Sequence, residues 1–193
     1  MSVLIIHPKD HSTDFLKPIY APIKDKTVIW GGIRKTHLMK LIEDHERIIM
    51  LGHGSPRGLL SMGQFYMAGN YIIDWSMAEL LSTKTNNTYI WCHADMFVQR
   101  YELKGLCSGM FISEVSEAFC YGFNDVDPNQ IEESNCYFSE ILARNINKPM
   151  NDLYHNVLQE YTILAKTNPI AKFNLERLNL NSNNIELWKH SFL

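Results

Sequence analysis

No apolar run in the sequence approaches the roughly 18 residues that a membrane-spanning helix requires, so we expect no such helix. The first residues, from Met1 to His7, also lack the positively charged segment and the cleavage site of a secretory signal. We therefore interpret them as the start of a first strand. Together these absences favour a cytoplasmic protein.

Positive and negative charges are also nearly balanced in the sequence. The formal net charge is -3 and the isoelectric point is near 6.2. Proteins that bind nucleic acid or anionic membrane surfaces commonly carry basic patches, and no stripe of basic and aromatic residues is present here. We expect neither nucleic acid nor a membrane as a partner.

Cysteine is scarce, and no pair shows CxxC spacing. The four positions are Cys92, Cys107, Cys120 and Cys136. Neither a zinc site nor a disulfide scaffold is indicated, and we expect reduced thiols. The sequence also lacks a phosphate-binding glycine-rich loop and a cluster of metal-ligating residues, so we predict no metal and no cofactor.

The sequence does contain enough apolar material for one sizeable core. It has 193 residues, of which 46% are hydrophobic and 11% aromatic, and no repeat or low-complexity linker divides them. We predict a single domain over residues 1–193. Its core is expected to cover residues 1 to about 145, with C-terminal helices and a tail at about 146–193.

Short apolar runs alternate with helical patterns through the first half of the chain. We expect strands at 3–6, 27–30, 48–51 and 88–91, and helices at 12–19, from Thr36 onward and at 77–81, the last with Asp74 or Ser76 as its cap. Alternating strands and helices are typical of right-handed parallel crossovers. The predicted fold class is therefore α/β, with a doubly wound, mostly parallel sheet of about six strands flanked by helices.

The second half of the chain is assigned from turn residues and helical spacing. We expect a β-hairpin at 59–71, a loop at 97–104, a helix at 109–119, a last strand at 121–126, helices at 131–145 and 151–166, and a polar tail from Asn174. His7 and His11 follow the first strand, and we expect both to lie in a solvated loop.

Two of the expected strands stop at one reactive side chain each. The apolar run 48–51 is followed by Gly52-His53-Gly54, and the run 88–91 is followed by Cys92. In open α/β sheets, ligands bind in the crevice outside the carboxyl ends of neighbouring strands. An imidazole and a thiol at that edge form the pair that nucleophilic cysteine catalysis requires.

An apolar strand that ends in His-Gly, followed by a later one that ends in Cys, resembles the caspase-like (clan CD) cysteine peptidases. The arrangement is most similar to the compact bacterial CHAT-type and caspase-like members, whereas papain-like enzymes have the opposite order. Residues 58–61 and 71–74 look like the hairpin and helix lead-in that CHAT-type domains place between their catalytic residues. The resemblance covers residues 1 to about 145 and implies a fold of the caspase-hemoglobinase type.

The same resemblance implies a cysteine endopeptidase that acts through a Cys-His dyad and a covalent acyl-enzyme. Cys92 is then the nucleophile, and His53 is the acid/base that protonates the leaving amine. The backbone N–H groups of Gly54 and Cys92 are the expected oxyanion hole, and a side chain at Gly54 is expected to fill space meant for substrate. The expected partners are a protein or peptide substrate and a regulatory protein.

We expect the substrate specificity of this protein to differ from that of most caspase-like peptidases. Many members carry a polar or acidic residue two positions before the nucleophile, where this chain has Ile90. Ile90 indicates an apolar or shallow pocket, while Asp74 and Asp95 are candidates for binding a basic side chain. We also expect residues 97–104 to be a mobile loop that helps to form the pocket.

Two alternatives remain open. The first is a catalytically idle caspase-like module that serves as an interaction scaffold. The second uses Gly-Leu-Cys-Ser-Gly at 105–109, with Cys107 as nucleophile, which matches the nucleophile elbow of α/β-hydrolases. That elbow requires a buried apolar strand before the nucleophile, and the preceding residues 99–104 are too charged for one.

Overall fold

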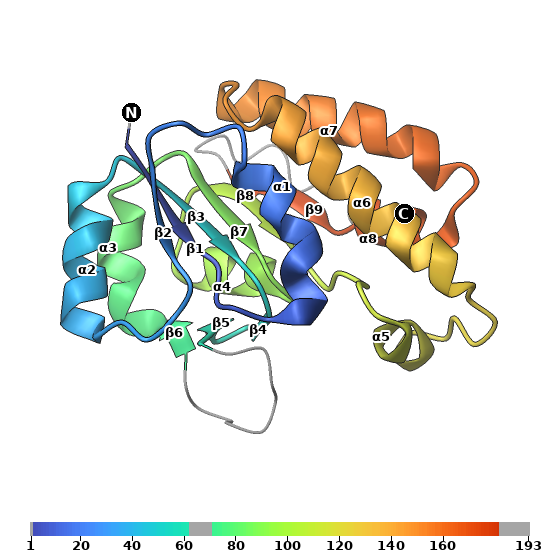
Figure 1. Ribbon diagram of the computed structural model, residues 1–193, viewed down its shortest axis with the longest axis horizontal. Helices are drawn as coiled ribbons and strands as arrows, with labels where there is room; N and C mark the ends of the chain where they lie inside the picture. Colours follow the sequence, from blue (N-terminus) through green and yellow to red (C-terminus); the bar gives the residue numbers. More distant parts are fainter. Residues whose placement is uncertain (1, 62–70, 182–193) are drawn as a thin grey trace.

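The computed structural model describes residues 2–61 and 71–181. Within these residues the main sheet has six strands, which are β1 (Val3–Ile6), β2 (Lys26–Ile29), β3 (Arg47–Leu51), β7 (Asn87–Ile90), β8 (Gly105–Ser108) and β9 (Leu178–Asn181). Helices lie on both sides of this sheet (Figure 1). The predicted α/β class, with a mostly parallel sheet flanked by helices, is confirmed.

The strand order in the main sheet is β2-β1-β3-β7-β8-β9, and β9 runs antiparallel to β8 while the other pairs are parallel. Strands β1, β3, β7 and β8 are buried at every position. Parallel strands that are covered on both faces form continuous apolar runs instead of alternating patterns. For this reason the strands at 3–6 and 48–51 could be recognised in the sequence.

Each face of the main sheet has its own layer of helices. One face packs against α1 (Lys17–Tyr20), α6 (Pro128–Asn145) and α7 (Met150–Ala165), and the other against α2 (Lys35–Asp44), α3 (Ala78–Ser82) and α4 (Ala94–Arg100). Alternate residues of a strand supply the two cores. In β3, Ile49 and Leu51 belong to the first core, and Ile48 and Met50 to the second. Figure 1 shows α2 and α3 at the left, with α6 and α7 at the upper right.

A second, smaller sheet begins directly after His53. It consists of β4 (Gly54–Ser55), β5 (Gly58–Leu60) and β6 (Tyr71–Ile73), which pair in antiparallel fashion. Strands β5 and β6 are neighbours, as the predicted hairpin at 59–71 requires, although its residues 62–70 lie outside the described residues. Asp74 follows this sheet and caps the 3-10 helix η2 (Trp75–Met77), which leads into α3.

Several predicted helices are confirmed with shifted bounds. Those at 131–145 and 151–166 correspond to α6 and α7, and the helix expected from Thr36 is α2. The segment 12–19 forms a 3-10 helix, η1 (His11–Leu16), that continues into α1. None of the helices in the described ranges is long and apolar enough to cross a membrane.

The predicted loop at 97–104 is wrong. Helix α4 occupies its first part, and Phe97 and Val98 are fully buried. Ala94 is buried on the same side of this helix, so the three residues have the i, i+3, i+4 spacing of an apolar helical face. The exposed Gln99 and Arg100 obscured this pattern in the sequence. A segment anchored in the core in this way is not the mobile pocket loop that we expected.

The predicted helix at 109–119 is confirmed only in its second half, and the predicted strand at 121–126 is wrong. Residues Gly105–Ser108 form β8, and the only helix in the following segment, within the described residues, is the short α5 (Val115–Cys120). Residues 121–126 form turns and irregular backbone. The sixth strand comes instead from the expected polar tail, where α8 (Pro169–Leu175) is followed by β9. Leu178 and Leu180 alternate there with less buried asparagines, which is the pattern of an edge strand.

His7 is buried, although a solvated loop was expected. It is 1% exposed, with Nδ1 3.1 Å from the Tyr20 hydroxyl and Nε2 3.2 Å from the Thr13 hydroxyl. Burial lowers the pKa of His7 to about 4, and the positive charge of Lys17 acts in the same direction. The ring is therefore neutral at pH 7. His11, in contrast, is fully exposed as expected.

We predict that acid destabilises the protein in part through His7. Its pKa is about 4 in the folded state against an ordinary value of 6.5, so between these two pH values the unfolded state binds a proton that the folded state does not. The contribution of His7 to the free energy of unfolding is complete above pH 6.5 and falls by about 3 kcal/mol as the pH is lowered to 4. Urea titrations between pH 7 and pH 4 test this: His7→Gln flattens the pH dependence and the exposed control His11→Gln does not. Equal slopes for His7→Gln and wild type contradict the prediction.

Candidate active site

His53 and Cys92 leave the main sheet at equivalent positions. Strands β3 and β7 are parallel neighbours, with Leu51 opposite Ile90, and each reactive residue comes two positions later. The Gly52 N–H donates to the Ile90 carbonyl at 3.0 Å, which continues the pairing beyond the end of β3. The predicted placement of both residues at the carboxyl ends of two strands is confirmed, and the strands are adjacent.

Both side chains line one small cavity at this edge. Its volume is about 20 Å³, and its other lining residues are Thr13, Phe15, Leu16, Gly52, Ile90, Trp91, Phe111 and Ser113. A cavity of this size holds roughly one water molecule and no peptide side chain. Within the described residues, no hydrogen bond joins the Cys92 sulfur to the His53 ring. The two residues therefore share a cavity that is too small for a peptide side chain.

The His53 ring is held by a chain of hydrogen bonds through Ser12 and Asp10, which follow β1 in the sequence, and we call this chain the relay. The Ser12 Oγ lies 2.6 Å from His53 Nε2 and donates its own proton to Asp10 Oδ1 at 2.9 Å. Because that proton is used on the carboxylate, Ser12 Oγ accepts from Nε2–H, so the neutral tautomer that fits this geometry carries its proton on Nε2. Asp10 Oδ2 lies 3.9 Å from Nε2. The relay thus leaves His53 Nδ1 as the nitrogen that can take up a proton.

Asp10 and Ser12 were not recognised as site residues from the sequence. They follow β1, which pairs with β3 so that Ile6 lies opposite Met50, and this brings the loop after β1 to the same edge as His53. Asp10 also caps η1, since it accepts the Ser12 backbone N–H at 2.9 Å. The strand order was the missing information, because the sequence does not reveal which strand lies beside β3.

Cys92 is half-buried, and two oxygens lie within reach of its single thiol proton. The sulfur lies 3.7 Å from the Phe111 carbonyl and 3.7 Å from Glu117 Oε1. Burial raises the pKa of Cys92 to about 12, and the negative charge of Glu117 is the second largest cause. The group is therefore a thiol at neutral pH, and no resting thiolate is present.

Glu117 is fixed in this position by its other oxygen. Oε2 accepts from the Ser113 N–H at 2.8 Å, the Ser113 hydroxyl at 3.0 Å and the Glu114 N–H at 3.2 Å. The bond from the Glu114 N–H belongs to the capping box at the start of α5, and the two bonds from Ser113 add to it. The sequence did not indicate this neighbour of Cys92, because one continuous helix was expected over 109–119.

The absence of a side chain at Gly54 has a different reason from the one expected. A Cβ there would lie 2.1 Å from Cδ1 of Trp91 and 2.6 Å from the Gly58 carbonyl oxygen. Glycine is therefore required for packing against the indole, whose Nε1 donates to the Ser55 carbonyl at 3.1 Å. The expectation that a side chain would occupy substrate space is not supported. The role of the Gly54 N–H in an oxyanion hole stays a prediction.

The three predicted substrate-binding residues lie in different environments. Ile90 is 3% exposed and lines the cavity beside Cys92. Asp74 caps η2 and forms an ion pair with Lys35 at 2.8 Å. Asp95 lies in the first turn of α4, and burial raises its pKa. Neither aspartate lines the cavity, and their role in binding substrate stays a prediction.

The geometry of a nucleophile elbow is absent at Cys107. This residue lies inside β8 and is fully buried, whereas an elbow nucleophile is exposed at a turn from a strand to a helix. The hydrolase alternative that uses Cys107 is therefore not supported. No cluster of three or more metal-ligating side chains occurs within the described part of the chain.

We predict that Glu117→Gln makes Cys92 more reactive. The substitution removes a negative charge that raises the pKa of the thiol, so a larger fraction is thiolate at a given pH. A fall of one pKa unit gives about a 10-fold faster alkylation by iodoacetamide at pH 8. Peptide mapping by mass spectrometry over pH 7 to 10 measures the rate, with exposed Cys120 as the internal control. An unchanged rate at Cys92 contradicts the prediction.

Comparisons with models of known protein families, with curated proteins and with solved structures find no match. The chemical interpretation of this site therefore rests on its own residues.

Proposed function

We propose that this protein is a cysteine endopeptidase with Cys92 as nucleophile and His53 as acid/base. One observation carries the proposal: neighbouring parallel strands deliver a thiol and an imidazole in register to a shared cavity at the carboxyl edge of an α/β sheet. The relay from Asp10 and Ser12 supports it, because a histidine that transfers protons must be held in one tautomer and orientation.

The proposed reaction follows from the free nitrogen of His53. The Cys92 sulfur bonds to the carbonyl carbon of the substrate while its proton passes to His53 Nδ1, and the carbonyl oxygen becomes an oxyanion. The backbone N–H groups of Gly54 and Cys92 are the proposed donors to this oxyanion. Nδ1–H then protonates the leaving amine, the C–N bond breaks, and a thioester forms. Water hydrolyses the thioester, and its proton returns through His53 to the sulfur.

The high pKa of the thiol places a condition on this reaction. Transfer of the proton to His53 has to accompany attack, because free thiolate is not available beforehand. A substrate also has to widen a cavity of about 20 Å³. The proposal therefore includes movement of η1 or of the segment around Phe111 and Ser113, because both contribute lining residues to the cavity. The proposed location of the protein is the cytoplasm. The proposed cause of the opening is the binding of a regulatory protein.

A second candidate is the catalytically idle interaction module. The observation that favours it is the state of Cys92, whose thiol lies 3.7 Å from oxygens of Glu117 and Phe111 and has a raised pKa beside a small cavity. A structural cysteine in a packed site has these properties. The two candidates differ in whether a peptide electrophile can reach the sulfur.

Covalent labelling with a panel of peptide acyloxymethyl ketones tests the peptidase proposal. We expect intact-protein mass spectrometry to show one adduct on wild type that disappears in Cys92→Ala. In His53→Ala the rate falls by about 100-fold, since general acid–base catalysis contributes at least this factor. Cys120→Ala is the matched control, because this thiol is exposed and does not line the cavity. The absence of any adduct at Cys92 with all peptides would favour the interaction module.

Ser12→Ala tests the relay. The substitution leaves His53 Nε2–H without its acceptor and removes the hydroxyl bond to Asp10, so the ring is no longer held in one tautomer. We predict that labelling of Cys92 slows by about 10- to 100-fold, as expected for loss of a hydrogen bond to a group that becomes charged. Ser12→Thr keeps the hydroxyl and restores the rate. Equal rates for Ser12→Ala and Ser12→Thr would rule out the relay.

A further inference from the structure

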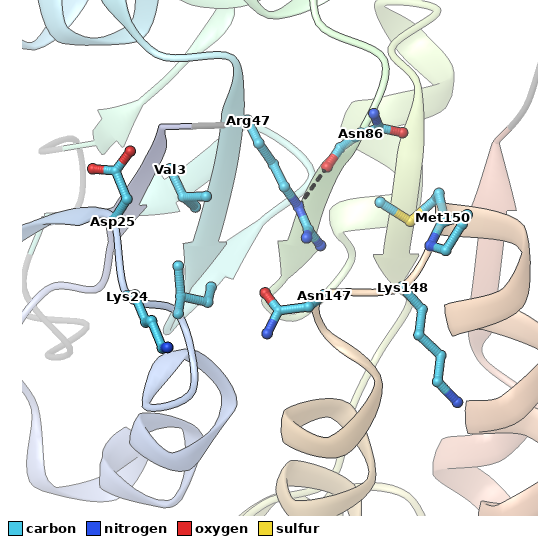
Figure 2. A pocket seen from close by; sticks show the side chains of 10 residues that line it. Val3, Lys24, Asp25, Arg47, Asn86, Asn147, Lys148 and Met150 are labelled. Carbon is cyan, nitrogen blue, oxygen red and sulfur yellow. Dashed lines mark hydrogen bonds between the residues drawn. The ribbon is translucent and has the colours of Figure 1, made fainter.

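A second, larger cavity lies at the opposite edge of the main sheet. Its volume is about 410 Å³, within the range of small-molecule sites. Val3 and Arg47, the first residues of β1 and β3, line it, so it lies at the amino ends of the strands whose carboxyl ends lead to the candidate active site. Figure 2 shows this cavity with its lining side chains.

Arg47 brings a buried positive charge to this cavity. It is 4% exposed, and its guanidinium donates to the Asn86 carbonyl at 2.9 Å, to the Ile146 carbonyl and to the Thr88 hydroxyl at 3.4 Å. All three acceptors are uncharged. Burial lowers the pKa of Arg47 to about 10, so the group is still charged at neutral pH. In the described ranges, no carboxylate forms an ion pair with it.

A buried charge without a counter-charge is unfavourable, and a ligand of opposite sign removes this cost. A guanidinium has five N–H donors in a planar fork, and three hydrogen bonds of Arg47 to protein groups are present. Two donors therefore remain, which is the number that one oxyanion group can accept in a bidentate contact.

The other charged residues of the cavity point to the same ligand class. Lys24 and Lys148 line it together with Arg47, and Asp25 is the one carboxylate among the lining residues. Figure 2 shows Lys24 and Lys148 on either side of Asn147, with Arg47 reaching toward this asparagine from the start of β3. Three cations against one carboxylate leave an excess of two positive charges, which matches a dianionic group.

A neighbouring cavity extends the site along the same edge. Its volume is about 330 Å³, and it shares Asn86, Pro149 and Met150 with the first one. Lys104 adds a further cation to its lining. The shared residues place the two cavities side by side, and we call the two together the hollow. The larger of them alone has room for a group bigger than a bare oxyanion.

We propose that this hollow binds a small phosphate monoester, whose phosphate group lies between Arg47, Lys24 and Lys148. The arginine supplies a fixed bidentate donor, and the two lysines supply mobile charge at the rim. The site is independent of the proposed peptidase chemistry, because it uses none of its residues.

Titration calorimetry and thermal unfolding at constant ionic strength test this proposal. Inorganic phosphate and glycerol 3-phosphate are the probes, and acetate is the monovalent control. At a probe concentration of ten times Kd, we expect the Tm of wild type to rise by about 4 °C. Tighter binding of glycerol 3-phosphate than of phosphate identifies a monoester as the source, and equal or weaker binding overturns that assignment.

Two double variants keep the test specific to the cavity. Lys24→Gln/Lys148→Gln removes two exposed cations of the lining and is expected to weaken phosphate binding by at least about 10-fold. Lys40→Gln/Lys166→Gln makes the same change in net charge at exposed positions on α2 and after α7, and it is expected to bind like wild type. No phosphate-dependent rise in Tm, an equal rise with acetate, or equal binding by the two double variants would overturn the proposal.

Discussion

Parallel pairing of β3 with β7 is the constraint on which the candidate site depends. The register that sets Leu51 opposite Ile90 also fixes where His53 and Cys92 leave the sheet. A slip of one residue would exchange the side chains of β3 between the two cores, since alternate residues belong to opposite faces. The two packed helix layers therefore determine the relative position of two reactive side chains that lie just beyond the strands.

The two proposed sites lie at opposite ends of strand β3. Arg47 begins the strand and is tied by hydrogen bonds to Asn86, Thr88 and Ile146 of neighbouring segments, whereas His53 follows the strand and is tied to Ser12. The residues between them are buried throughout. Each site thus draws its partners from loops that the sheet brings together, and the chemistry of either end does not require the other.

The sequence allowed a correct prediction where a residue pattern is compatible with only one type of secondary structure. Continuous apolar runs indicated buried parallel strands, and the residues after them, His53 and Cys92, could be placed at one edge. The sequence was uninformative where a residue acts through a partner distant in the chain. Asp10 and Ser12 reach His53 only because β1 lies beside β3, and Glu117 reaches Cys92 only because α5 is short. Helix α4 and strand β9 were missed because polar residues of the more exposed face stand between or beside the buried residues in the sequence.

The state of the Cys92 thiol separates an enzyme from an interaction module in physical terms. Burial and the Glu117 carboxylate both disfavour the thiolate, while the relay through Ser12 leaves His53 ready to accept a proton. In the proposed peptidase, the thiol proton passes to His53 only as the sulfur attacks a carbonyl, while Glu117 stays held by Ser113 and Glu114. In an interaction module no electrophile reaches the sulfur, and the thiol stays protonated.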